Sequence, residues 1–138
     1  MDSSGKVALI TGSARRVGRA IALELADAGF DIAVHFKTSA DAAREVAGEI
    51  RKRGRRVTLV SCELADLEMI KNIVSDTLEA FGRIDVLVNN AAVFARTPVD
   101  QLDLAQWDRL IRVNMVAPLM LGRLVASQMK NIGGGRII

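Results

Sequence analysis

Two glycines six positions apart, Gly12 and Gly18, lie in the stretch TGSARRVG at residues 11–18, between a short apolar run and a segment of helical periodicity. A glycine turn that opens a helix leaves backbone N–H groups free. Together with the positive end of the helix dipole, these groups suit a pyrophosphate. The alternative is an ordinary strand-to-helix turn that needs glycine for its backbone conformation. Two glycines alone do not decide between these interpretations.

A second polar group, Lys37, Thr38 and Ser39, follows the next apolar segment, and no acid lies between Asp31 and Asp41. A site for NAD usually has Asp or Glu here, which accepts a hydrogen bond from the ribose 2′-hydroxyl. A cation with two hydroxyl groups suits a 2′-phosphate instead, and Arg16 could reach the same region from the glycine turn. This pattern favours NADP over NAD. The alternative is that Lys37 only solvates a loop.

The elements that position these groups alternate along the chain. Continuous apolar runs predict strands, and segments with apolar residues at helical spacing predict helices. The predicted strands are at 7–11, 31–36, 56–61, 84–89 and from 136. The predicted helices are at 17–28, 39–53, 66–81 and 104–130. Strict alternation with short connections predicts one α/β domain over residues 1–138, with a Rossmann-type doubly wound parallel sheet. Ligands bind such sheets at the carboxyl ends of the strands, here at residues 11–18, 36–39, 61–65 and 89–95.

The composition narrows the classes of partner. The net charge of +3 comes mainly from basic clusters at 15–19 and 51–56. No aromatic residues that could stack on bases lie beside them, so no nucleic acid is expected. One cysteine and one histidine cannot build the usual zinc site, so no metal is expected. No signal peptide and no uninterrupted apolar run of membrane-spanning length are found, which predicts a cytoplasmic protein without a membrane partner.

Three motifs together, TGSARRVG, NNAA at 89–92 and VNMVAP at 113–118, make the chain resemble the short-chain dehydrogenase/reductase family. The resemblance runs from Lys6 to Ile138. The pattern TGxxxRxG followed by HFKTS is most similar to the pteridine reductase branch, in which arginine also replaces the middle glycine. The resemblance implies an NADP(H)-dependent oxidoreductase of a carbonyl or pterin substrate.

The resemblance also implies roles for individual positions. The residues that it places around the pyrophosphate and adenosine ribose are Gly12, Ser13, Arg15, Arg16, Val17 and Gly18. It implies that Lys37, Thr38 and Ser39 bind the 2′-phosphate and that Glu63 and Leu64 flank the adenine. It also implies that Asn90, Ala91 and Ala92 lie beside the nicotinamide ribose. Asn114 matches the catalytic asparagine that kinks the long helix and helps to hold a proton-relay water. The chain departs from the family in having Glu63 where Asp is commoner, and NNAA where NNAG is common.

The residues that complete the family's reaction are a serine, an acid/base tyrosine and a lysine four residues after it, all beyond the fifth strand. This sequence contains no tyrosine. The resemblance therefore predicts the amino-terminal half of a reductase, truncated at the start of the fifth strand and inactive alone. The alternative is a noncatalytic nucleotide-binding or scaffold module.

The helix at 104–130 is apolar on more than one stripe, as if it were buried both against the sheet and against a second neighbour. In the family that neighbour is another subunit, which predicts a homo-oligomer formed through this helix. Leu121 is expected in the middle of the contact face, so that Leu121→Glu would dissociate the assembly or make the protein insoluble.

Overall fold

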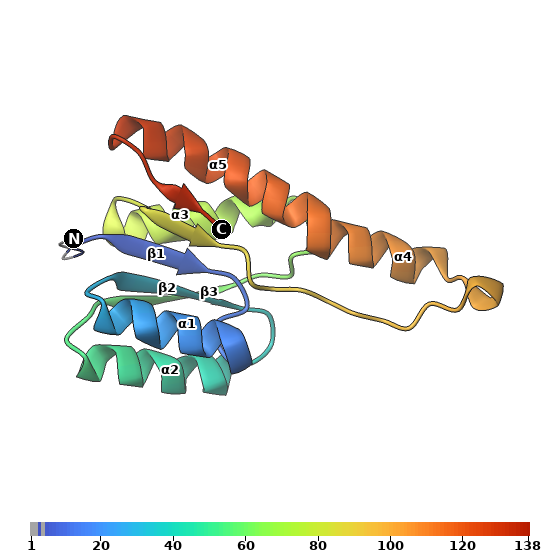
Figure 1. Ribbon diagram of the computed structural model, residues 1–138, viewed down its shortest axis with the longest axis horizontal. Helices are drawn as coiled ribbons and strands as arrows, with labels where there is room; N and C mark the ends of the chain where they lie inside the picture. Colours follow the sequence, from blue (N-terminus) through green and yellow to red (C-terminus); the bar gives the residue numbers. More distant parts are fainter. Residues whose placement is uncertain (1–2, 4) are drawn as a thin grey trace.

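The computed structural model describes residue 3 and residues 5–138; Met1, Asp2 and Ser4, which the predicted domain includes, lie outside the described residues. All five strands are parallel and lie side by side in the order β3-β2-β1-β4-β5 (Figure 1). Their bounds are β1 Val7–Ile10, β2 Asp31–Phe36, β3 Val57–Ser61, β4 Val86–Val88 and β5 Arg136–Ile137. Strand order reverses between β1 and β4, which confirms the predicted doubly wound α/β fold.

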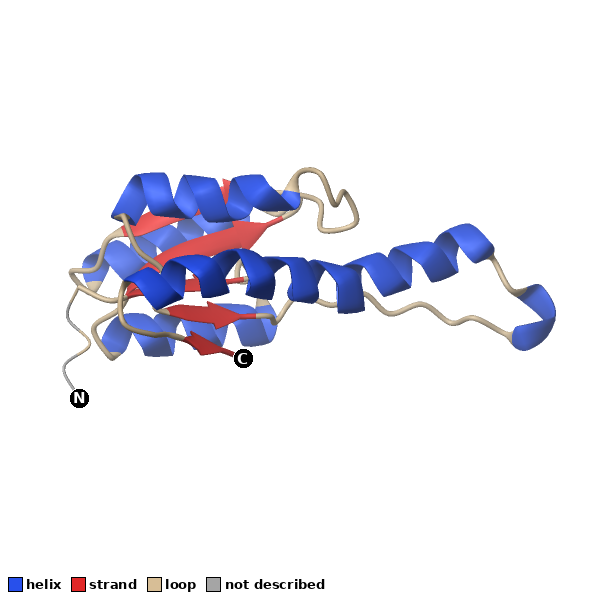
Figure 2. Cartoon of the chain, turned by 90° about the horizontal axis from the view of Figure 1, so that it is seen from above, coloured by secondary structure: helices blue, strands red, loops and turns tan. Residues whose placement is uncertain are grey.

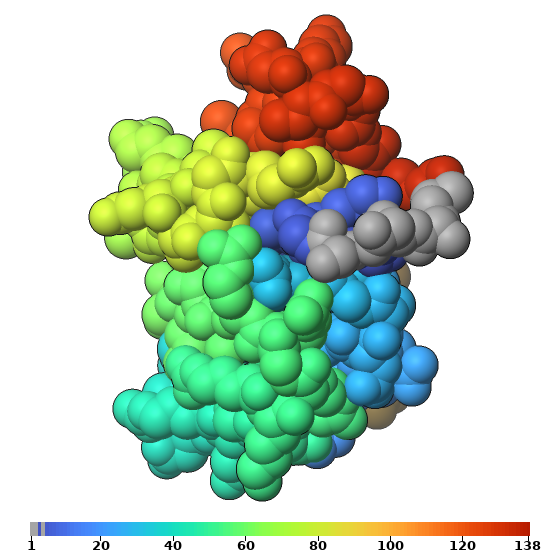
Figure 3. Space-filling model, turned by 90° about the vertical axis from the view of Figure 1, so that its left-hand side faces the viewer, coloured from blue at the N-terminus to red at the C-terminus, as the bar shows by residue number. Residues whose placement is uncertain are grey.

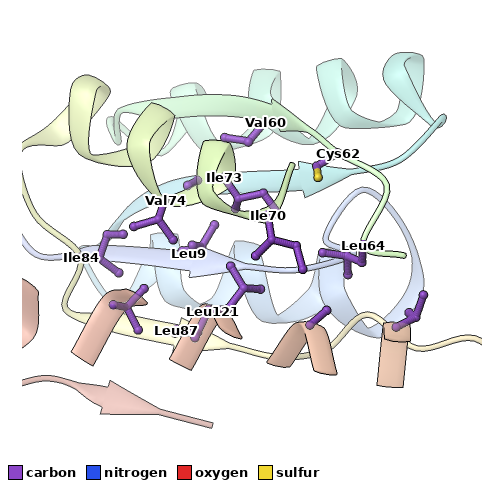
Figure 4. Packing of buried hydrophobic residues seen from close by; sticks show 14 of the residues in the cluster. Leu9, Val60, Cys62, Leu64, Ile70, Ile73, Val74, Ile84, Leu87 and Leu121 are labelled. Atoms are coloured by element: carbon purple, nitrogen blue, oxygen red, sulfur yellow. The ribbon is translucent and has the colours of Figure 1, made fainter. Parts of the chain in front are cut away.

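Helices cover both faces of the sheet (Figures 1 and 2). The first two, α1 Arg16–Asp27 and α2 Ala40–Lys52, lie on one face, and α3 Ile70–Phe81 and α5 Ala117–Asn131 lie on the other. Each face has its own apolar cluster. In the cluster on the α3 and α5 side, Leu9 of β1 points toward Ile70 of α3 and Leu121 of α5 (Figure 4). A sheet covered on both faces explains why β1 is a continuous run of buried apolar residues.

The long helix predicted over 104–130 is interrupted. It consists of α4 Leu104–Ile111, a π-helical segment Arg112–Val116, and α5. Within the π segment the Ala117 N–H donates to the Arg112 carbonyl, five residues back. The physical reason is Pro118, which has no N–H to donate to the Asn114 carbonyl and whose ring crowds that carbonyl. The predicted kink at Asn114 is therefore a widened turn.

The start of α3 also differs from the prediction. The sequence predicts that this helix begins at Asp66, a residue type that can cap a helix, but α3 begins at Ile70. The Asp66 side chain instead accepts a hydrogen bond from the Glu68 N–H at 3.2 Å, and the Met69 N–H donates to the Asp66 carbonyl at 3.1 Å. Asp66 thus closes a separate turn ahead of the helix. The other helix ends agree with the sequence to within two residues.

The segment that follows β4 and leads into α4, with the short 3₁₀ helix Val99–Gln101, extends beyond the sheet as an arm (Figures 1 and 2). By length and composition alone, the helix Leu104–Asn131 is long and apolar enough to cross a membrane, although it contains no uninterrupted apolar run of that length. One face of this helix is buried against the sheet, at positions spaced by four residues, Val113, Ala117, Leu121, Val125 and Met129.

The outer face of the same helix carries other apolar side chains. Leu119 is 72% exposed and Met115 is 58% exposed, whereas Leu121 is 1% exposed. The expectation that Leu121 lies on an outer contact face is therefore wrong, because Leu121 belongs to the core beneath the helix. Viewed from the left-hand side of Figure 1, α5 forms a ridge above the rest of the molecule (Figure 3).

Candidate cofactor-binding site

The glycine turn joins β1 to α1 at the carboxyl end of the sheet. Gly12 has a φ of +64°, which is the left-handed conformation that glycine adopts without strain. The Ser13 hydroxyl donates to the Ile10 carbonyl at 2.8 Å, so this buried side chain holds the turn rather than facing solvent. The closest packing is at Gly18, where a Cβ would lie 2.4 Å from the Gly12 carbonyl oxygen. Both glycines are therefore required by the shape of the turn.

Hydrogen bonds tie this turn to the loop after β4. The Asn90 side-chain amide donates to the carbonyls of Thr11 at 2.9 Å and Gly12 at 3.2 Å. In return the Thr11 hydroxyl oxygen accepts from the backbone N–H groups of Asn90 and Ala91, each at 3.0 Å. The ends of β1 and β4 are thus fixed to each other at the point where strand order reverses. The sequence placed Thr11 at the end of a strand, where the glycine turn begins, and gave no sign of these hydrogen bonds.

The start of α1 forms the first of three neighbouring hollows. It has a volume of about 330 Å³ and is lined by Gly12, Arg15, Arg16, Val17, Gly18, Asn90, Ala91 and Ala92. The first N–H groups of a helix have no intrahelical partner, and the helix dipole is positive here. Arg16 has a φ of +51°, unusual for a residue with a side chain. The hollow therefore combines free donors, positive charge and the two loops that the sequence assigned to one ligand.

The second hollow lies at the end of β2 and is lined by Gly12, Ala14, Arg15, Phe36, Lys37 and Ser39. Two cations and a hydroxyl group thus surround a small space, a donor set that fits a phosphate. Arg15 reaches this hollow, whereas the sequence favoured Arg16 as the arginine near Lys37; Arg16 lines the first hollow instead. Thr38 is exposed on the adjoining loop, where its carbonyl accepts from the Ala40 N–H.

Glu63, after β3, connects the second hollow to α4. Its carboxylate pairs with the Lys37 ammonium group and, at 3.0 Å, with the Arg109 guanidinium group. Burial raises the pKa of Glu63, but hydrogen bonds from Lys37, the Ala65 N–H and Arg109 outweigh that effect and lower the pKa to about 2. Glu63 is therefore ionised at neutral pH, and a 2′-phosphate would compete with it for Lys37. The sequence gave no sign of Arg109, because this partner lies 46 residues away.

A third hollow, beside Glu63, holds the rest of the predicted site. It is lined by Gly12, His35, Lys37, Cys62, Glu63, Leu64, Ala91, Ala92, Val93, Arg109 and Val113. Burial, and then the nearby carboxylates of Asp66, Glu63 and Asp76, raise the pKa of the Cys62 thiol to about 11. The thiol is therefore protonated at neutral pH and is not a nucleophile. Within the described residues, no three His, Cys, Asp or Glu side chains are grouped to hold a metal ion.

Asn114 uses its side chain to hold the loop after β4. Its Oδ1 accepts from the Val93 N–H at 2.9 Å, and its Nδ2 donates to the Val93 carbonyl at 2.8 Å. This paired contact fixes Val93 to the π segment and sets the position of the neighbouring Ala91 and Ala92. The side-chain amide thus bonds a neighbouring loop rather than the backbone of its own helix. Its predicted part in a proton relay stays a prediction.

The strand order, the glycine turn at the reversal point and the phosphate-sized hollows define an α/β domain of the Rossmann type. The chain belongs to the short chain dehydrogenase family, whose sequence profile matches residues 6–138.

Known members of the family are similar along the whole chain. An uncharacterized oxidoreductase of Thermotoga maritima is 40% identical over 97% of this chain and 52% of its own length. A metagenomic short-chain oxidoreductase solved in complex with NADP is 36% identical, with a TM-score of 0.92 over 99% of this chain and 62% of that one. FolM alternative dihydrofolate reductase 1 of Brucella canis, also complexed with NADP, is 31% identical with a TM-score of 0.92 over 99% and 55%. The chain spans about half the length of the curated relatives it matches.

Proposed function

We propose that this chain is the NADP(H)-binding part of a short-chain oxidoreductase that acts on a carbonyl or pterin substrate. The observation that carries the proposal is the hollow at the end of β2, where Arg15, Lys37 and Ser39 converge. The nearest carboxylate, Glu63, already accepts three hydrogen bonds and is poorly suited to bind a ribose hydroxyl. The NADP-bound relatives support this cofactor, and the FolM relative supports a pterin as one substrate class.

The remaining residues have distinct roles in this proposal. The start of α1 binds the pyrophosphate through its N–H groups and Arg16, beside Gly12, Ser13, Val17 and Gly18. Thr38 contributes beside Lys37, Glu63 and Leu64 flank the adenine, and Asn90, Ala91 and Ala92 contact the nicotinamide ribose. When bound, NADPH supplies the hydride for reduction. The residues of this chain bind and orient the cofactor, and Asn114 fixes the loop beside its reactive end.

The test is calorimetric titration of the purified chain with NADP and with NAD. NADP is expected to bind more tightly, and Lys37→Asp should remove about tenfold or more of that preference, because a charge-assisted hydrogen bond is replaced by repulsion. Lys52→Asp changes the net charge equally at the exposed end of α2, and should leave the preference intact. Equal affinities for the two cofactors in the unmutated chain would refute the assignment of NADP.

A second prediction concerns turnover. The 138 residues include no tyrosine that could act as the family's acid/base, so the chain alone is expected to bind cofactor without oxidising it. The same observation favours the alternative of a noncatalytic nucleotide-binding module. The measurement is NADPH absorbance over time with pterin and carbonyl compounds, against a mock preparation. Steady oxidation above that background would show that another group supplies the proton.

We also propose that two or more copies associate through the outer face of α4 and α5. Leu119 and Met115 are exposed there, on a helix whose opposite face is already packed on the sheet. Burial of such apolar area favours association, and a two-fold axis is the commonest symmetry for such an assembly.

The cytoplasmic location of the protein stays a prediction.

A further inference from the structure

His35, the one histidine of the chain, lies near the end of β2 and is 2% exposed. Its ring joins two loops that are far apart in sequence. Nδ1 lies 3.1 Å from the Gly12 nitrogen, and Nε2 lies 3.0 Å from the Cys62 carbonyl oxygen. The backbone of His35 takes part as well, because its carbonyl accepts from the Ser13 N–H at 2.9 Å. One residue therefore holds two consecutive N–H groups of the glycine turn.

The two ring contacts determine where the proton lies. A backbone N–H can only donate, so Nδ1 must be the acceptor for Gly12. A carbonyl can only accept, so Nε2 must carry the proton and donate it to Cys62. Only the neutral ring with its proton on Nε2 satisfies both partners. A second proton, on Nδ1, would point directly at the Gly12 N–H and break that hydrogen bond.

We propose that His35 is a positioning residue for the pyrophosphate-binding turn, and that protonation of its Nδ1 releases Gly12 and weakens NADP binding at acidic pH. The inference rests on the proposed function, because it concerns the same turn. Gly12 is held on its other side by Asn90. Loss of the ring contact therefore frees the Gly12 N–H, while the Gly12 carbonyl stays bonded to Asn90 and the Ser13 N–H stays bonded to the His35 carbonyl. The glycine turn can then shift, and the donors at the start of α1 lose their alignment.

The charges that face His35 come from three elements packed around the same hollow: Lys37 at the end of β2, Glu63 after β3 and Arg109 on α4. The Cys62 thiol there stays neutral. Burial lowers the pKa of His35 below its ordinary 6.5, and the opposing effects of the Cys62 carbonyl and the Glu63 charge are smaller. The folded chain therefore keeps the ring neutral at pH 7. Below about 6.5 the unfolded chain binds the proton more readily, so stability falls as the pH falls toward the folded pKa.

Two amide variants separate the two ring contacts. In His35→Asn the amide oxygen takes the place of Nδ1 and still accepts from Gly12. In His35→Gln the amide nitrogen takes the place of Nε2 and donates to Cys62, which leaves Gly12 without its acceptor. Neither amide titrates. At pH 7.5 the Asn variant should bind NADP nearly as tightly as the unmutated chain, and the Gln variant about tenfold more weakly, the usual effect of one lost hydrogen bond of this kind.

The pH profile distinguishes positioning from general stability. Affinity for NADP, measured from pH 7.5 to 5, should fall further in the unmutated chain than in His35→Asn. The 2′-phosphate of NADP itself gains a proton near pH 6 and affects both proteins equally. Only the difference between the affinity profiles of the unmutated chain and His35→Asn therefore reports on His35. Unfolding by urea at each pH verifies that the protein is folded. Identical profiles, or equal affinities of the Asn and Gln variants, would overturn the inference.

Nuclear magnetic resonance keeps this inference distinct from the proposed function. In ¹⁵N-labelled chain at neutral pH, His35 should show its proton on Nε2 and a coupling across the hydrogen bond from the Gly12 N–H. The Gly12 amide signal should move with the ring signals on acidification, and should not move in His35→Asn. If the unmutated chain binds no NADP at any pH, the proposed function fails, and these signals then decide whether protonation of His35 releases Gly12. If the Gly12 amide signal does not move while the His35 ring titrates, the inference is refuted.

Discussion

Gly18→Ala is expected to abolish measurable NADP binding and to destabilise the chain by about 1–3 kcal/mol or more, the usual cost of overpacking. The added Cβ would lie 2.4 Å from the Gly12 carbonyl oxygen, 2.5 Å from Asn90 Nδ2 and 2.9 Å from Ser13 Cα. Two of these three atoms belong to the backbone, which cannot rotate away as a side chain can. Relief of the contact must move the glycine turn or the start of α1, and both form the pyrophosphate hollow.

Gly48→Ala is the matched control for this substitution. Gly48 lies inside α2, and a Cβ added there meets no atom within 4 Å. Alanine should therefore stabilise the chain by about 0.5–1 kcal/mol, since glycine is unfavourable inside a helix. Urea unfolding and titration with NADP measure both variants. If the two variants were equally stable, or if Gly18→Ala bound NADP like the unmutated chain, the close packing at Gly18 would not matter for the site.

The order of the elements was predictable because most of the strands are apolar runs and the helices carry apolar residues at helical spacing. The start of α3 was not, because Asp66 can cap a helix or close a turn, and the choice depends on the hydrogen bonds of Glu68 and Met69. The π segment was only partly predictable. The family resemblance indicated a kink at Asn114, but the form of the kink depends on how the freed backbone groups find partners.

The candidate site also contains some residues that could be predicted from the sequence and others that could not. Gly12 and Gly18 on one short loop, and Lys37 on another, could be proposed as site residues from local sequence pattern. The positions of Arg15 and Arg16 could not, because Arg15 lines both hollows whereas Arg16, which has a positive φ, lines only the first. Contacts between distant loops leave no local signal. The pairing of Arg109 with Glu63 is of this kind, and so is the hydrogen bond from Gly12 to His35.

Leu121→Glu is expected to unfold the chain. Leu121 is 1% exposed in the cluster between α5 and the sheet. An ionised carboxylate buried there without a partner costs several kcal/mol, while the whole stability of a domain of this size is about 5–15 kcal/mol. Circular dichroism and urea unfolding measure the effect. A folded variant of near-native stability would show that α5 can lift from the sheet or turn Leu121 outward.

Leu119→Glu tests the other face of the same helix. Leu119 is two residues away but 72% exposed, so the new carboxylate stays in water and stability should change by no more than about 0.5 kcal/mol. If copies of the chain pack through this face, the charge should shift the assembly toward single chains, because carboxylates would meet across a two-fold axis. Light scattering at several concentrations gives the mass of both proteins. The same mass for Leu119→Glu and the unmutated chain would place any association elsewhere. The sequence could not separate these two leucines, because the helix is apolar on more than one side. Only the four-residue spacing of its buried positions, Val113 to Met129, shows which side lies on the sheet.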